Sequence, residues 1–170
     1  MAILNTMFSS QGITISTGLN FPDTQNASAD VNTLDDYEEG YATMTLTSQG
    51  GTITADTSYD QIAYTKIGRI VHFQGYINVS AISSPTGWTR MVGLPFNSSS
   101  LNESADTSSV SIRYNGLADD SGVEGAFSGY IAAGGDWFYI QGFDGTDAHN
   151  ISEHIGVNTS FTVTGTYIAA

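Results

Sequence analysis

The sequence of 170 residues contains no cysteine. Without thiols the chain cannot form a disulfide framework, a thiolate zinc site or a cysteine nucleophile, and its redox compartment stays open. Stability must therefore come from packing. A chain of this length fits one domain and can bury enough surface to be stable without a metal or a disulfide.

Basic residues are almost as scarce. The chain has 4 Lys and Arg against 17 Asp and Glu, a formal net charge of −13, and the four cations are scattered: Lys66, Arg69, Arg90 and Arg113. Nucleic-acid binders neutralise several phosphates with Lys and Arg, and anionic membranes attract basic clusters. We therefore expect neither nucleic acid nor a membrane as a partner. An acidic surface favours solubility or docking onto a basic protein.

Long apolar runs are also missing. No segment approaches the roughly 20 apolar residues that a membrane-spanning helix requires. The first residues, M-A-I-L-N-T-M-F-S-S-Q-G, lack the basic and apolar regions of a secretory signal. Neither a transmembrane segment nor a signal peptide is predicted.

What the sequence does contain is alternation of apolar and polar residues between turn residues. The clearest case is 69–79, where Val71, Phe73, Ile77 and Val79 share one face. Similar strands are predicted at 41–47, 62–67, 89–92, 108–114, 125–131, 136–143 and 161–168. Turns are expected at Pro85, Gly87, Asn115-Gly116 and Gly134-Gly135. The sequence predicts an all-β domain over residues 34–170, an antiparallel β-sandwich with a jelly roll favoured, and helices of one turn at most.

The first 33 residues differ from the rest and are predicted to form an extended N-terminal arm. They hold one short alternating segment, a proline and a polar run, which cannot make a core. An arm that becomes ordered on a partner loses conformational entropy, so burial of its apolar side chains must compensate. The expected contact residues are Ile3, Leu4, Met7, Phe8, Ile13 and Ile15.

Three landmarks point to a known kind of protein. Residues 18–40 read G-L-N-F-P-D-T-Q-N-A-S-A-D-V-N-T-L-D-D-Y-E-E-G, residues 64–71 read Y-T-K-I-G-R-I-V, and residues 93–96 read G-L-P-F. The first resembles a segment common in phage tail-fibre and virion structural proteins, which normally precedes an all-β module carrying the other two. One departure is that T-W-T-P or T-F-T-P commonly follows the segment, whereas this chain continues Y-A-T-M-T. Residues after 96 match no signature, so receptor preference does not transfer.

The resemblance implies a function in the virion. Stand-alone members resemble capsid decoration, or cement, proteins, and this chain has no repetitive shaft before the module. The favoured prediction is a homotrimer on the outer surface of the capsid that bridges the major capsid protein and stabilises the head. The alternative is a tail-fibre or receptor-binding protein that recognises host glycans. A carbohydrate-active enzyme ranks far lower, so no catalytic residue and no cofactor are expected.

The densest charge cluster is an acidic turn formed by Asp35, Asp36, Glu38 and Glu39. Hydrogen-bonded carboxylate–Arg pairs could set the register on a partner protein. The alternative is a solvated turn that leads into the first strand.

Aromatic residues supply the other candidate contacts: Trp88, Trp137 and Tyr139. Exposed Trp and Tyr side chains anchor interfaces and stack on sugars. Alternation places Trp137 and Tyr139 on one face of a strand and Phe138 and Ile140 on the other. Such a strand is buried either on both sides, by the core and a neighbouring subunit, or on one side only.

Possible ligands of a metal occur near the C-terminus: Asp144, Asp147, His149, Glu153 and His154. Their spacing matches neither an EF-hand nor a zinc motif, so a polar loop without a metal is predicted. The run Gly125-Ala-Phe-Ser-Gly129 is not a nucleophile elbow, because the serine stands at the wrong position and no helix follows.

Overall fold

The structure is a computed structural model that describes residues 36–118, 127–143 and 148–170. The arm predicted at 1–33, with its six apolar contact residues, lies outside the described residues, and so does Asp35.

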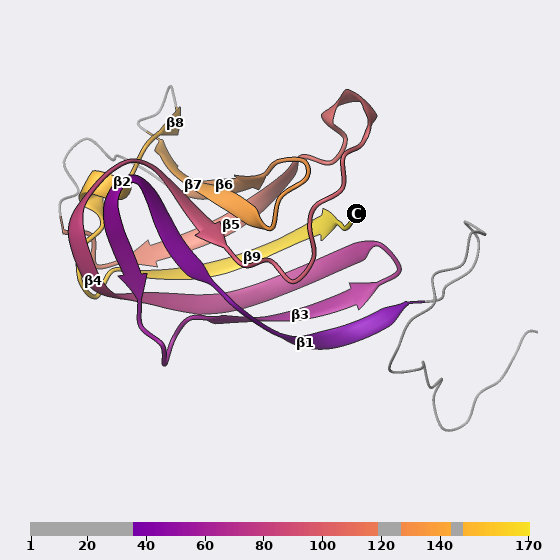
Figure 1. Cartoon of the computed structure of the whole chain (residues 1–170), viewed down its shortest axis with the longest axis horizontal. Coiled ribbons are helices and arrows are strands. Elements are labelled where there is room, and N and C mark those ends of the chain that lie inside the picture. Colours follow the sequence, from indigo (N-terminus) through magenta and orange to yellow (C-terminus); the bar gives the residue numbers. More distant parts are fainter. Residues whose placement is uncertain (1–35, 119–126, 144–147) are drawn as a thin grey trace, which may run out of the picture.

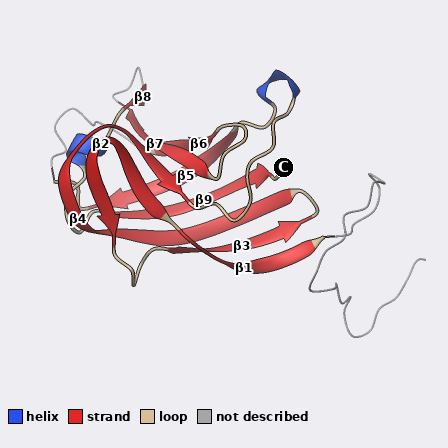
Figure 2. Ribbon diagram, in the orientation of Figure 1, coloured by secondary structure: helices blue, strands red, loops and turns tan. Residues whose placement is uncertain are grey.

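The described residues form nine strands and two single-turn 3₁₀ helices (Figure 2). The strands are β1 (Tyr37–Thr43), β2 (Thr45–Ala55), β3 (Gln61–Ile67), β4 (Ile70–Val92), β5 (Ser108–Asn115), β6 (Ser128–Ile131), β7 (Trp137–Phe143), β8 (Ala148–His149) and β9 (Ser160–Ile168). The helical turns are η1 (Asn102–Ser104) and η2 (Ser152–His154). The prediction of an all-β fold is confirmed.

Strand β4 closes the sheet into a barrel (Figure 1). Its first part, residues 70–78, pairs with β9, and its last part, residues 89–92, pairs with β7. The order β4-β9-β5-β6-β7 therefore returns to β4, and every one of these pairings is antiparallel. Strands β3 and β1 extend the sheet beyond β4, and β2 pairs along the bend of β4. The observed architecture is a barrel with additional strands, and a jelly roll is not specifically confirmed.

The turn predicted at Pro85 and Gly87 is wrong, because both residues lie within β4. The strand bends there, and β2 pairs with β4 on both sides of the bend. Ser84 and Gly87 have positive φ angles of 42° and 76°, and the register between β2 and β4 shifts three times along the bend. Such irregularities behave like β-bulges, which curve a strand and tolerate a proline that cannot donate a ladder hydrogen bond.

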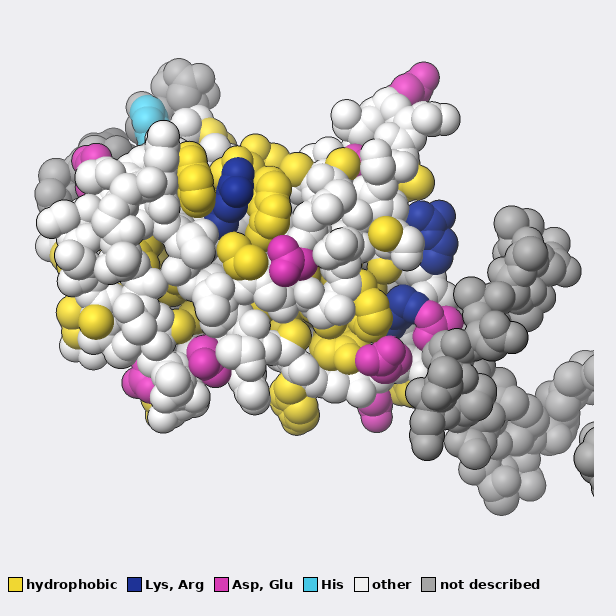
Figure 3. All heavy atoms as spheres, viewed as in Figure 1, with side chains coloured by type: hydrophobic (Ala, Val, Ile, Leu, Met, Phe, Trp, Pro, Cys, Tyr) yellow, Lys and Arg dark blue, Asp and Glu magenta, His cyan; other side chains and the backbone are white. Residues whose placement is uncertain are grey.

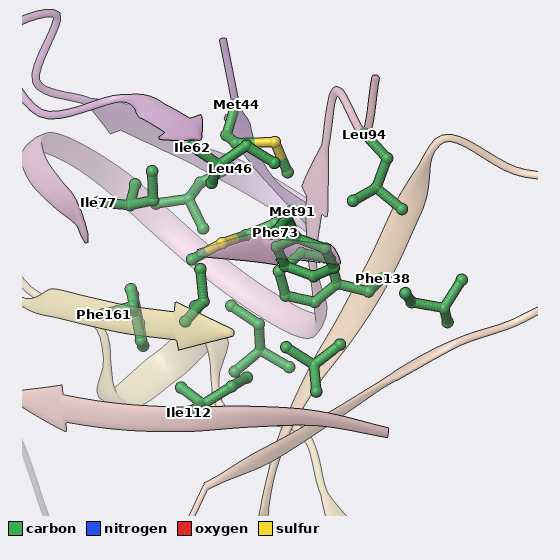
Figure 4. Close-up of a cluster of buried hydrophobic side chains, with 14 of the residues drawn as sticks. Met44, Leu46, Ile62, Phe73, Ile77, Met91, Leu94, Ile112, Phe138 and Phe161 are labelled. Atoms are coloured by element: carbon green, nitrogen blue, oxygen red, sulfur yellow. The ribbon is translucent and has the colours of Figure 1, made fainter. Parts of the chain in front are cut away.

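The hydrophobic core fills the barrel. Its side chains come from seven of the strands and from connecting segments, among them Met44, which lies between β1 and β2 (Figure 4). The predicted apolar face of 69–79 is confirmed, since Val71, Phe73, Ile77 and Val79 are fully buried. The Phe73 ring stacks on Phe138, with ring centres 5.7 Å apart. Opposite it, Gly165 leaves the space that the Phe73 ring occupies, because a Cβ there would lie 2.7 Å from the ring.

Candidate functional site

The predicted acidic turn is wrong as a turn, because Glu38 and Glu39 lie in β1, an edge strand that pairs with β3. Just before β1, Asp36 forms an ion pair with Lys66. The Lys66 side chain is buried, and its ammonium also lies 5.1 Å from the centre of the Phe96 ring. A buried ammonium needs an opposite charge, so Asp36 has a structural role within the chain.

The two glutamates are exposed at the sheet edge. Glu38 accepts a hydrogen bond of 2.6 Å from the Tyr64 hydroxyl, and Glu39 accepts one of 3.0 Å from the Tyr37 hydroxyl. Desolvation and the nearby Glu38 carboxylate raise the pKa of Tyr64 to about 12. Contact of these acidic residues with a partner protein stays a prediction.

The predicted aromatic residues come together around Arg90. Register pairing places Arg90 of β4 opposite Tyr139 of β7 and Val92 opposite Trp137. The guanidinium carbon lies 4.3 Å from the centre of the Trp88 ring, 4.0 Å from that of Trp137 and 4.6 Å from that of Tyr139. Arg90 also donates a hydrogen bond of 2.5 Å to the Tyr139 hydroxyl. We call these four residues the Arg90 cluster.

The Arg90 cluster answers part of the question that the sequence left open about β7. Phe138 and Ile140 are buried in the core, whereas Trp137 and Tyr139 are half-buried on the outer face. Within the chain, the Arg90 side chain covers that outer face. Sequence reasoning did not identify Arg90. The signal was present, because Trp88 and Arg90 are two residues apart and so share a strand face. Figure 3 shows a basic side chain flanked by hydrophobic ones on one face of the molecule.

A second feature of the outer face is a groove of about 710 Å³ that runs across β1, β3, β4, β9 and β5. Sequence reasoning missed it, because its lining residues belong to strands far apart in the chain. The side chains that line it include Tyr41, Gln61, Gln74, Tyr76, Arg113 and Thr162. Tyr41 and Tyr76 are 76% and 43% exposed.

The groove follows from strand register. Pairing places Thr162 of β9 beside both Tyr76 and Arg113, and Thr164 beside both Gln74 and Ser111. Alternation along β9 sends Thr162 and Thr164 outward and buries Val163 between them. The small side chains of β9 therefore leave space between the larger residues of β4 and β5, Tyr76 and Arg113.

The four cations differ in their surroundings. Lys66 and Arg90 are held by the ion pair and by the aromatic rings described above, and Arg69 donates a hydrogen bond of 3.2 Å to the Ala169 carbonyl. Arg113 is exposed, and within the described ranges its guanidinium has no ion-pair, hydrogen-bond or aromatic partner. It is the cation of the groove lining.

The residues considered as metal ligands do not form a site within the described part of the chain. His149 lies in β8, Glu153 and His154 lie in η2, and Asp144 and Asp147 fall outside that part. No group of three or more His, Cys, Asp and Glu among the described residues is placed to hold a metal ion. No helix in these residues is long and apolar enough to cross a membrane.

Comparison with solved structures gives a likeness, whereas no family model and no curated protein matches the sequence. Among solved structures, the chain is similar to the Dettilon tailspike protein (gp208), with 26% sequence identity and a TM-score of 0.65. The likeness covers 79% of this chain and 24% of the tailspike chain, so this chain spans about a quarter of that protein.

The tailspike likeness agrees with the resemblance to phage virion proteins seen in the sequence. Both support a phage structural protein with an all-β fold. The likeness leaves open whether that protein sits on the capsid surface or on the tail.

Proposed function

We propose that the chain is a module of a phage tail, of the spike or fibre kind, that binds the host cell surface. The observation that carries the proposal is the likeness to a tailspike over 79% of the chain. The tail was the alternative in the sequence-based prediction, and we propose it here because the similar solved structure is a tailspike.

The outer face of the barrel supports a binding role. It carries exposed tyrosines, amides and hydroxyls in one groove, and binding sites combine an apolar lining with a few polar groups in this way. We propose that the module acts by binding alone, without chemistry. The measurement is the size distribution of host surface polysaccharide after incubation with the protein. Shortening of the polymer would contradict a purely binding role.

Capsid decoration is the second candidate, because residues 18–40 resemble the segment found in stand-alone cement proteins. In that case Glu38 and Glu39 would face basic residues of the major capsid protein. Both candidates share a proposed homotrimer, which the resemblance to phage virion proteins implies and which is one form of closed cyclic symmetry. Native mass spectrometry of the purified chain measures that state directly, and a monomer at micromolar concentration would contradict it.

Localisation on the particle separates the two candidates. Virions labelled with gold-conjugated antibodies against this chain should carry gold at the tail in electron micrographs. Gold spread over the head would overturn the tail proposal and favour decoration.

Function at the tail has its own test. Purified protein added before infection should reduce adsorption of the phage to its host, because it occupies the same receptors. Unchanged adsorption at saturating protein would contradict receptor binding, even if the protein is on the tail.

A further inference from the structure

We infer that the groove across β1, β3, β4, β9 and β5 binds an oligosaccharide that carries a carboxylate, with Tyr76 stacking on a sugar ring and Arg113 pairing with the carboxylate. The inference rests on the proposed function for the source of the ligand, the host surface. The chemistry of the ligand follows from the groove itself.

The length of the groove favours an oligosaccharide over a single sugar. Tyr41 lies on β1 and Arg113 on β5, four strands apart in the order β1-β3-β4-β9-β5. Neighbouring strands lie about 4.8 Å apart, so the groove is about 19 Å wide from margin to margin. Its volume of about 710 Å³ falls in the range of ligand sites.

The aromatic contact comes from Tyr76. Its ring is 43% exposed and is held edge-on by Tyr59, with ring centres 5.7 Å apart and ring planes at 85°. A ring that is already held by a neighbour loses little conformational freedom when a ligand binds. Tyr41, which is 76% exposed, provides a second aromatic side chain at the β1 margin, opposite Arg113 at the β5 margin.

Polar groups between these margins suit sugar hydroxyls. Gln61, Gln74 and Thr162 line the groove, and each side chain both donates and accepts hydrogen bonds. The hydroxyl of Thr164 is already engaged, since it donates to the Phe73 carbonyl at 3.1 Å. The lining contains no carboxylate that would repel an acidic ligand at close range.

Arg113 is the reason why we expect the ligand to carry a negative charge. In a chain with a net charge of −13, long-range electrostatics cannot attract an anion, so an acidic sugar must be recognised by direct contact. Salt screens exposed charges beyond about 8 Å at physiological ionic strength, which limits the repulsion from distant acids. A guanidinium can hold a carboxylate through two parallel hydrogen bonds.

The Arg90 cluster is a poorer sugar site, although the tryptophans predicted to bind glycans lie there. Trp88 and Trp137 are half-buried, and their rings pack on the guanidinium of Arg90. Stacking on a sugar would compete with these contacts. The groove offers its tyrosine rings without that competition.

The experiment uses the full chain on an array of short oligosaccharides in matched pairs, with and without a uronic acid. We expect retention of carboxylated members and at most weak retention of their neutral counterparts. Titration calorimetry with the best carboxylated member should then show about tenfold weaker binding for Arg113→Gln and for Tyr76→Ala, the loss expected for one charged hydrogen-bonded contact or one stacked ring.

Matched controls lie elsewhere in the described structure, outside the groove lining. Arg69→Gln removes the same charge, and Tyr37→Ala removes the same ring, and both should bind as the unmodified chain does. Circular dichroism verifies that each variant is folded, and Arg113→Lys, which keeps the charge but not the two-pronged geometry, should retain intermediate affinity.

Three outcomes overturn the inference. The first is no retention of any carboxylated oligosaccharide, and the second is equal retention of neutral and carboxylated members. The third is binding that survives both groove variants but is lost in Trp137→Ala, which would place the site at the Arg90 cluster. If the protein blocks phage adsorption yet fails these tests, the groove assignment is wrong while the proposed function stands.

Discussion

The Arg90 cluster and the groove are two regions of the outer surface, built from the same residue types. Each contains an arginine and aromatic side chains contributed by neighbouring strands. In the cluster, three ring centres lie within 4.6 Å of the Arg90 guanidinium carbon. In the groove, Arg113 is exposed without a described partner, and Tyr41 is 76% exposed. Composition therefore does not separate a stabilising contact from a binding site. What separates them is whether the groups already satisfy one another.

The comparison assumes that both regions stand on one rigid barrel, and Phe73→Ala tests that assumption with the largest expected effect. Phe73 is fully buried against Phe138 and Tyr167. Loss of such a ring leaves a cavity and costs about 3–5 kcal/mol of unfolding free energy. Chemical denaturation monitored by fluorescence measures it. A cost below about 1 kcal/mol would mean that the barrel core does not support the two surfaces.

Lys66 represents a third environment for a cation, because it forms a buried ion pair with Asp36. Lys66→Met should give the next largest loss of unfolding free energy. The substitution leaves Asp36 with a partly buried and unpaired charge, and we expect a loss of about 2–3 kcal/mol. The double variant Lys66→Met/Asp36→Asn should recover most of it, because no charge then remains unpaired. Denaturant unfolding of the unmodified chain, the two single variants and the double variant forms the measurement, and additive losses would contradict the pairing.

The sharpest test of the comparison is a matched pair, Arg90→Met and Arg113→Met. Removal of Arg90 forfeits several cation–π contacts and a hydrogen bond, and should lower the unfolding free energy by about 1–2 kcal/mol. Removal of Arg113 should change it by less than about 0.5 kcal/mol, because an exposed side chain without partners contributes little. Thermal unfolding compares the two variants. Equal losses of unfolding free energy would contradict the distinction between Arg90, which has partners within the chain, and Arg113, which has none among the described residues.

The smallest effect concerns pH at the β1–β3 edge beside the groove. The pKa of Tyr64 is raised from 10.0 to about 12, so folding favours the protonated phenol. Its contribution to stability is complete below pH 10 and is lost as pH rises through 12. Absorbance at 295 nm during an alkaline titration should show a late-ionising component that loses one tyrosine in Tyr64→Phe, while burial of Tyr167 raises its pKa as well and keeps part of that component. Titration of all tyrosines near pH 10 would contradict the contact with Glu38.

Much of the secondary structure follows from local pattern. The alternation in 69–79 identified the four core side chains Val71, Phe73, Ile77 and Val79, and the alternation of 136–143 placed Phe138 and Ile140 opposite Trp137 and Tyr139. Local pattern failed at Pro85 and Gly87, where two turn residues lie in one bent strand. A bulge and a turn use the same residue types, and only pairing with β2 and β7 distinguishes them.

The candidate site was accessible to sequence reasoning only in part. Trp88, Trp137 and Tyr139 were identified as contact residues because of their chemistry, but Arg90, which they surround, was not. No local sequence pattern predicts the groove. Tyr41, Tyr76 and Arg113 lie on β1, β4 and β5, which are distant in the chain and are brought into one sheet only by the pairing of strands.

By itself, the sequence determined that this is an all-β chain without thiol chemistry or a basic surface, and it determined which face of each clear strand points inward. Those properties depend on composition and on a two-residue period, which are local. The tertiary structure alone decided that β4 pairs at both ends to close a barrel and that Arg90 is enclosed by aromatic rings. It also decided that Arg113 is exposed and has no partner among the described residues. Register between distant strands sets each of these outcomes, because it decides which outward side chains meet and satisfy one another.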